Sequence, residues 1–317
     1  MRSGGLVGYN PRVPATPSQR LLYPALVGAI AVTALTAPDS SWLGGAAGVA
    51  SPGIALILAA FYALIALLER WRPYRAAWTH SAGDLGADSL HLALTGPLTS
   101  GLFDVGVRGV AVAAGIRLAD LTGGTWWPAR WPLPAQVALA MLVAELGHYA
   151  FHRLTHERAL PWRLHATHHS APRLYWLNAT RFHPLDLFGL IVLQSTPLLL
   201  LGIPARTYAS YALFAALYGQ LQHCNVDVRT GRWLDWVFST PALHRWHHSR
   251  DPREGNHNYG AILNAWDHAF GSYFRPADRP FAGGVGIDHL DAFPRSWPAQ
   301  LLSPFRWRRI VADSATR

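Results

Sequence analysis

The chain has 317 residues, of which 50% are hydrophobic and only 14% are charged, and its mean hydropathy is positive. Soluble domains contain about 25% charged residues, so this composition argues against an ordinary water-soluble enzyme. The net charge of +9 is scattered between apolar segments, which argues against nucleic-acid binding and is typical of charges that flank membrane segments.

The cysteine and histidine contents narrow the possible chemistry. The single cysteine, Cys224, excludes an internal disulfide, a zinc site built from several cysteines and an iron–sulfur cluster, because each needs more than one thiol. In contrast, the chain has 16 histidines, and 13 of them lie between His148 and His268. We therefore look for function in that segment.

The first apolar segments predict a membrane hairpin. A basic tail over residues 1–20 precedes an uncharged run from Leu21 to Ala37, and a second uncharged run extends from Leu43 to Leu68. The basic aromatic residues 69–75 that follow are of the kind that anchors a helix at the cytoplasmic membrane surface. A signal peptide is the alternative interpretation of the first run.

The next segments are apolar but less regular. Residues 90–116 include Asp104 and Arg108, which are costly in a bilayer unless they are paired, so we expect a re-entrant or interfacial helix there. Three tryptophans between residues 126 and 131 then precede an apolar helix that starts before residue 137 and leads directly into the histidines. A last apolar pair, 187–203 and 207–221, has His183 just before it and His223 just after it.

These segments predict an all-α, multi-helix integral membrane protein with a cytosolic, histidine-rich cap that holds two metals. The positive-inside rule places the basic tail and the histidine groups on the cytoplasmic side. We divide the chain into an N-terminal tail (1–20), membrane helices (21–136), a catalytic domain with histidine motifs (137–275) and a C-terminal tail (276–317).

Eight histidines occur at spacings that suit metal binding. They form one H-x3-H group and two H-x2-H-H groups: His152 and His156; His165, His168 and His169; His244, His247 and His248. Residues four apart on a helix share one face, so such pairs can reach one ion. A zinc ion takes at most four protein ligands in the usual sites, so eight imidazoles imply two ions, and imidazole suits iron, zinc, copper or nickel.

The segment from Glu145 to Phe274 resembles the fatty acid hydroxylase and sterol desaturase superfamily of membrane di-iron oxidases. The resemblance is carried by the three histidine groups and by Arg181-Phe-His183-Pro184, His223-Cys-Asn225, Asn258-Tyr259-Gly260 and Trp266-Asp267. The order of the groups is similar to that of the sterol desaturase branch. The resemblance implies a helical membrane stem, two iron ions, dioxygen as the oxidant, a lipid substrate and His223 as a ninth ligand.

Other polar residues in this segment have less certain roles. His183 is either a ligand or a cap of the helix that begins at Pro184, while His148 and His257 are expected to be structural or to support ligands. Asn258, Tyr259 and Asp267 are candidates to orient the imidazoles, since a metal-bound histidine usually donates its other N–H to an oxygen. Glu145-Leu-Gly-His148 matches one unit of ferritin-like di-iron sites, but no second copy exists.

The sequence therefore predicts a membrane-bound di-iron oxygenase that hydroxylates or desaturates a lipid C–H bond. The chain has no cysteine pair for a cluster and no Gly-rich nicotinamide motif, so we expect electrons from a ferredoxin or b-type cytochrome with its reductase. Cap arginines such as Arg245, Arg250 and Arg253 are candidates to steer an acidic carrier.

Two alternatives remain. An intramembrane zinc hydrolase would use Glu145 or Glu157 as a general base, but the sequence lacks His-Glu-x-x-His. A metal transporter would need polar residues through its membrane helices, and the apolar runs 43–68 and 187–203 supply almost none.

Overall fold

The structure is a computed structural model that describes residues 15–37, 51–277 and 279–316. Apart from isolated β-bridges, the regular structure of these residues is entirely helical, which confirms the predicted all-α class. The longer helices are α1 (Pro17–Thr36), α2 (Pro52–Trp71), α5 (Gly109–Thr122), α6 (Leu133–Glu157), α7 (Ala159–His169), α8 (Pro184–Leu200) and α9 (Ala205–His223). The shorter ones are α3 (Leu85–Leu90), α4 (Gly96–Phe103), α10 (Gly231–Val237), α11 (Pro241–His247), α12 (Pro252–Gly255), α13 (Ala265–Ala269), α14 (Trp297–Leu301) and α15 (Trp307–Ala315).

Two helices are long and apolar enough to cross a membrane, α1 and α2. Each has 20 residues, which at about 1.5 Å per residue matches the roughly 30 Å hydrocarbon core. Only 22% of the apolar window of each helix is buried, and α2 exposes Leu56, Leu67 and Trp71. The predicted hairpin thus has two helices of suitable length, while residues 43–50 of its second run lie outside the described residues.

The segment predicted to be interfacial or re-entrant is one nearly continuous helical path. From Leu85 to Thr122, α3, α4 and α5 follow one another through two π-helical turns, His91–Thr95 and Asp104–Arg108. Asp104 and Arg108 form an ion pair of 3.1 Å one helical turn apart, and both remain partly exposed. This pairing lowers the cost of placing both charges in an apolar helix.

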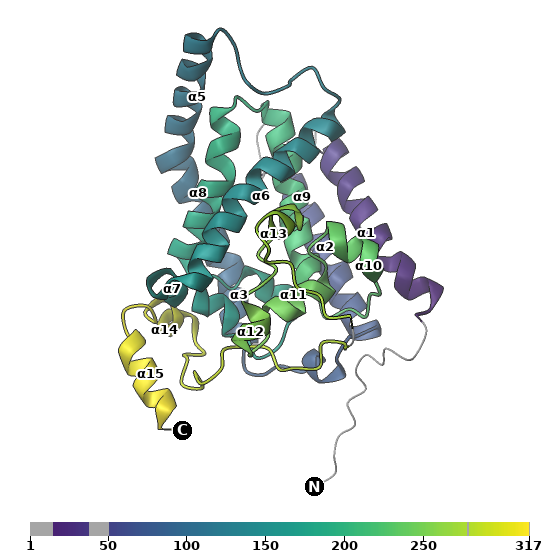
Figure 1. Cartoon of the computed structure of the whole chain (residues 1–317), viewed down its shortest axis with the longest axis vertical. Helices are drawn as coiled ribbons and strands as arrows, with labels where there is room; N and C mark the ends of the chain where they lie inside the picture. Colours follow the sequence, from purple (N-terminus) through teal and green to yellow (C-terminus); the bar gives the residue numbers. More distant parts are fainter. Residues whose placement is uncertain (1–14, 38–50, 278, 317) are drawn as a thin grey trace.

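The long helices run between two ends of the molecule, and the end with α7 and α11 is the polar one, because it carries the buried histidines (Figure 1). The loop between α5 and α6 and the turn between α8 and α9 lie at the top of the view, whereas α7 and α10–α12 lie toward the opposite end with α14 and α15. Between the ends, α6, α8 and α9 pack around a core that includes Ala144, Leu198, Leu217 and Leu221. We call the polar end, which carries the histidine motifs, the cap.

Helices α6 and α8 approach each other unusually closely at Gly147. A Cβ atom added there would lie 2.0 Å from the backbone oxygen of Leu193, which is far inside van der Waals contact. Gly147 lies between Glu145 and His148, little more than one turn before His152. The absence of a side chain therefore sets how near the histidine-bearing end of α6 comes to α8.

We expect Gly147→Ala to push α6 and α8 apart and to lower the unfolding temperature in detergent, at a cost of about 1–3 kcal/mol from overpacking. Gly219→Ala in α9 is the matched control, because a Cβ there meets nothing within 4 Å. Alanine has the higher helix propensity, so the control should be neutral or stabilising by up to about 1 kcal/mol. Equal unfolding temperatures for the two variants would contradict the close contact.

Candidate metal centre

The histidine motifs converge in the cap as two adjacent clusters. The first, the five-histidine cluster, contains His152, His156, His165, His169 and His247. The second, the four-histidine cluster, contains His168, His223, His244 and His248. In each cluster, one ring nitrogen per residue lies within 4.8 Å of the corresponding nitrogen of every other member.

The two H-x2-H-H groups divide between the clusters in opposite ways. In α7, His165 and His169 belong to the five-histidine cluster, and His168 belongs to the four-histidine cluster. At α11, His244 and His248 join the four-histidine cluster, and His247 crosses to the other one. Residues four apart share a helix face and the residue at i+3 is rotated from it, so each group supplies both clusters.

Burial keeps these imidazoles in the form that binds metals. All except His156, which is partly exposed, are at least 95% buried. Loss of hydration disfavours the charged ring and lowers the pKa of His152 to about 4 and that of His223 to about 3. The rings are therefore neutral at physiological pH, with one nitrogen free to accept a proton or a metal.

Oxygen acceptors fix the tautomer of six of the nine rings. The Nδ1 atoms of His152, His168 and His247 donate to the backbone oxygens of Tyr259, Arg181 and His257, while those of His165, His156 and His223 donate to the side-chain oxygens of Asp186, Asn256 and Asn178. These distances range from 2.8 to 3.2 Å. An Nδ1 that carries the hydrogen leaves Nε2 bare, and the bare nitrogens face the clusters.

Some of these unprotonated nitrogens lie close to one another but cannot form a hydrogen bond, because neither atom carries a hydrogen. The Nε2 atoms of His152 and His165 are 3.1 Å apart, and neither carries a hydrogen. Among the described residues, no hydrogen-bond partner exists for the buried Nε2 atoms of His156, His169 and His247. Unpaired buried nitrogens are costly, and their convergence is explained if they share a cation.

The spacing also fits a metal ion. The Nε2 atom of His244 lies 2.7 Å from that of His223 and 3.0 Å from that of His248. Two nitrogens that are each about 2.1 Å from one ion and subtend a right angle lie about 3.0 Å apart. Within the described part of the chain no carboxylate joins either cluster, so both are all-imidazole sites suited to iron, zinc, copper or nickel.

His183, a predicted ligand, lies outside both clusters. Its Nδ1 accepts the amide hydrogen of Leu185 and so caps α8, and its Nε2 is hydrogen-bonded to the backbone oxygen of Leu301. The ring is thus committed to two local contacts, and of the two predicted roles the structure favours the helix cap. His148 is also outside the clusters, where its Nδ1 contacts Gln194 at 2.7 Å.

Of the residues proposed to orient or support the imidazoles, three do so through the backbone. Tyr259 and His257 act through their backbone oxygens. Asp267 acts indirectly, because it accepts the amide hydrogens of Tyr259 and Gly260. Asn258 has a structural role instead: its side chain forms hydrogen bonds with the backbone of Phe274, and its own backbone adopts a φ of 57°.

Sequence reasoning missed three residues that hold the ligand rings, Asp186, Asn178 and Asn256. They lie 21, 45 and 100 positions from the histidines that they contact, so no local spacing reveals them. Of the three, Asp186 was the easiest to find from the sequence. It is an acidic residue in the first turn of the apolar helix α8, two positions after Pro184.

Comparison with known proteins identifies the family. The family described as fatty acid hydroxylase matches residues 137–272, which include every histidine of both clusters. The ornithine lipid hydroxylase OlsE of Rhizobium tropici is 42% identical over 244 residues, which cover 77% of this chain and 72% of that protein. The chain belongs to the fatty acid hydroxylase family. This membership confirms the predicted superfamily of lipid hydroxylases and desaturases.

More distant members of the fatty acid hydroxylase superfamily also match. An alkylglycerol monooxygenase of Danio rerio is 32% identical over 187 residues, covering 59% of this chain and 38% of that protein. A Delta(7)-sterol 5(6)-desaturase, ERG3B, of Gibberella zeae is 28% identical over 162 residues, which cover 50% of this chain and 45% of that protein. The relatives therefore extend beyond the sterol desaturase branch. No solved structure matches the chain significantly.

We expect Asp186→Ala to lower metal retention about 10- to 100-fold, because His165 loses the acceptor that fixes its ring. Asp186→Asn keeps an oxygen at the same place and should retain more metal than the alanine variant. The measurement is the metal content of each purified variant after dialysis against increasing chelator. Equal retention by Asp186→Ala and the parent protein would show that this contact does not support a metal site.

Proposed function

We propose that this chain is a membrane-bound di-iron oxygenase that hydroxylates or desaturates a C–H bond of a lipid with dioxygen and external electrons. The observation that carries the proposal is the pair of adjacent all-histidine clusters in a member of a lipid-oxidising family. Relatives named for ornithine lipid, alkylglycerol and sterol substrates support a lipid substrate, and hydroxylation is favoured by the more similar of them.

Each cluster would hold one iron ion, through five and four imidazoles respectively. Bound iron supplies activation of dioxygen and removal of hydrogen from an unactivated carbon. The protein keeps the imidazoles neutral and oriented through the oxygen acceptors described above. It also buries eight of the nine rings, which limits the access of water.

An opening leads to the five-histidine cluster. A pocket of about 310 Å³ is lined by His156, His169 and His247, together with Trp162 and the loop around Asn256. None of the four-histidine cluster lines this pocket. We therefore place substrate approach on the side of the five-histidine cluster.

The zinc hydrolase alternative finds little support in the two glutamates proposed as its base. Glu145 is 2% exposed and accepts the amide hydrogens of Ala261 and Ile262, each at 3.0 Å, which commits it to holding a loop. Glu157 lines the opening but forms an ion pair of 2.6 Å with Arg153.

Three arginines of the cap were proposed to steer an acidic electron carrier, and the structure distinguishes between them. Arg250 and Arg253 are exposed and suit an acidic ferredoxin or cytochrome, although each also has an aspartate partner. Arg245 does not suit this role. Its guanidinium is buried 3.7 Å from the centre of the Tyr74 ring, and it donates to the backbone oxygens of Cys224 and Val226.

We expect the purified protein to contain close to two iron ions per chain. His168→Ala and His247→Ala remove one nitrogen from the four- and five-histidine clusters, respectively, and each should lose iron and activity. His80→Ala is the control, because His80 is exposed and belongs to neither cluster. Elemental analysis and lipid mass spectrometry measure both effects. Full activity with one metal per chain would refute the two-ion assignment.

Topology supplies a second test, since the positive-inside rule places the cap in the cytoplasm. In a Cys224→Ala background, cysteines at the exposed cap positions Arg158 and Arg253 should react only from the cytoplasmic side. A cysteine at Trp126, which is 62% exposed in the loop between α5 and α6, should react from the other side. Reaction of the two cap positions from opposite sides would contradict the proposed orientation.

The source of the inserted oxygen separates an oxygenase from a hydrolase. A hydroxylated product should carry label from isotopic oxygen gas and none from labelled water, and turnover should need a reductant; desaturation should consume oxygen without labelling the lipid. A zinc hydrolase would work without oxygen and would take its oxygen from water. Turnover at an undiminished rate under anaerobic conditions would therefore rule out the proposed function.

A further inference from the structure

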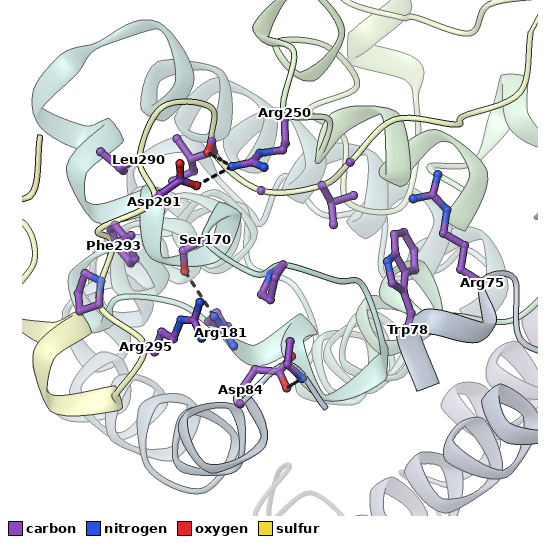
Figure 2. A pocket seen from close by; sticks show the side chains of 18 residues that line it. Arg75, Trp78, Asp84, Ser170, Arg181, Arg250, Leu290, Asp291, Phe293 and Arg295 are labelled. Carbon is purple, nitrogen blue, oxygen red and sulfur yellow. Dashed lines mark hydrogen bonds and ion pairs between the residues drawn. The ribbon is translucent and has the colours of Figure 1, made fainter. Parts of the chain in front are cut away.

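A second cavity, of about 320 Å³, lies in the cap (Figure 2). It lies beside the opening to the five-histidine cluster. Its walls come from the loop after α2, the turn after α7 and the C-terminal segment 284–295. Four arginines line it: Arg75, Arg181, Arg250 and Arg295. In Figure 2, Arg181 and Arg295 lie at one side of the cavity, and Arg75 lies at the other side beside Trp78.

Positive charge exceeds negative charge in this cavity. Its lining contains two carboxylates, and both are already engaged: Asp84 accepts two hydrogen bonds from Arg173, and Asp291 pairs with Arg250. Among the described residues, Arg75 and Arg295 have no carboxylate partner. The cavity therefore favours an anion.

A buried donor supports this conclusion independently of the charge count. Arg181 is 3% exposed, its Nε pairs with Asp88, and its Nη1 donates to Ser170 at 3.4 Å. Its Nη2 has no hydrogen-bond partner among the described residues. A buried guanidinium with an unused donor is costly unless an acceptor completes it, and carboxylate and phosphate oxygens match its geometry.

The cavity adjoins the opening to the histidines. The two share Arg250, Gly286 and Ile287 as wall residues. The wall also contains Ser170, which directly follows His169, while the backbone oxygen of Arg181 accepts the hydrogen of His168. A molecule in the arginine cavity would therefore lie next to one that reaches the five-histidine cluster.

We propose that the arginine cavity binds the anionic polar end of the lipid substrate, a phosphate or carboxylate group, while the reacting part extends into the opening at His156, His169 and His247. This assignment rests on the proposed function, because it treats the occupant as the substrate. Arg181 and Arg295 supply hydrogen bonds to the anion, and Arg75 and Arg250 supply positive charge.

Binding to the purified, iron-loaded protein in a neutral detergent tests the proposal without turnover. The probes are dihexanoyl phosphatidate, N-octanoylglycine, the uncharged dihexanoylglycerol and inorganic phosphate. The variants are Arg295→Gln, which removes a cavity arginine, and Arg308→Gln, which removes an exposed arginine from α15 outside the cavity. Both side chains are exposed and, among the described residues, form no hydrogen bond or ion pair, so both variants should fold, and a thermal scan checks this.

At least one anionic amphiphile should bind more tightly than dihexanoylglycerol, and Arg295→Gln should weaken it by about 5- to 10-fold, the loss of one charge-assisted hydrogen bond. Arg308→Gln should leave the affinity unchanged. Equal binding of the uncharged lipid, or equal weakening by the two variants, would overturn the proposal. So would inorganic phosphate that binds as tightly as the amphiphiles, because it would show a site for a free anion.

The outcomes also separate this proposal from the proposed function. Selective binding of an anionic amphiphile without any lipid oxidation would remove the oxygenase assignment and with it the identification of the occupant as a substrate. Lipid oxidation by a protein that does not distinguish charged from uncharged amphiphiles would leave the oxygenase intact and overturn only the anionic subsite.

Discussion

The structure depends on the cost of bringing nine imidazoles together in the cap, eight of them buried, with ring nitrogens that converge on one another. A buried ring nitrogen needs a partner, and in six rings the outer nitrogen finds an oxygen. The inner nitrogens face one another instead, and those of His152 and His165 are 3.1 Å apart. The arrangement is favourable when a cation lies between them, so both clusters are suited to binding metal, and a bound metal would stabilise the fold.

The rest of the cap serves this arrangement through a series of buried polar contacts. Glu145 and Asp267 hold the backbone of residues 259–262 through four amide hydrogen bonds. That loop presents the Tyr259 oxygen to His152, and Gly147 lets α6 approach α8, which carries Asp186 to His165. Glu145, which resembled part of a ferritin-like ligand set, is thus a structural residue. It holds the loop that contacts His152.

The sequence predicted which histidines form the site, but not how they are arranged in space. Helical spacing alone identified the eight histidines of the three motifs, because i, i+3 and i+4 positions are fixed by the helix. His223 was proposed from family resemblance, and the structure brings it within the four-histidine cluster. The reciprocal division of α7 and α11 between two clusters could not be predicted, since it depends on how the two helices face each other. The acceptors Asn178 and Asn256 were hidden for the same reason: their contacts are set by tertiary packing across long separations.

The central claim is that two unlike histidine clusters hold two iron ions. Mössbauer spectroscopy of the reduced protein, purified from cells grown on iron-57, tests it most directly because every iron nucleus contributes to the spectrum. Five and four nitrogen ligands create different electric field gradients, so the account predicts two ferrous quadrupole doublets of equal area. A spectrum from a single iron site, in protein with its full activity, would contradict it.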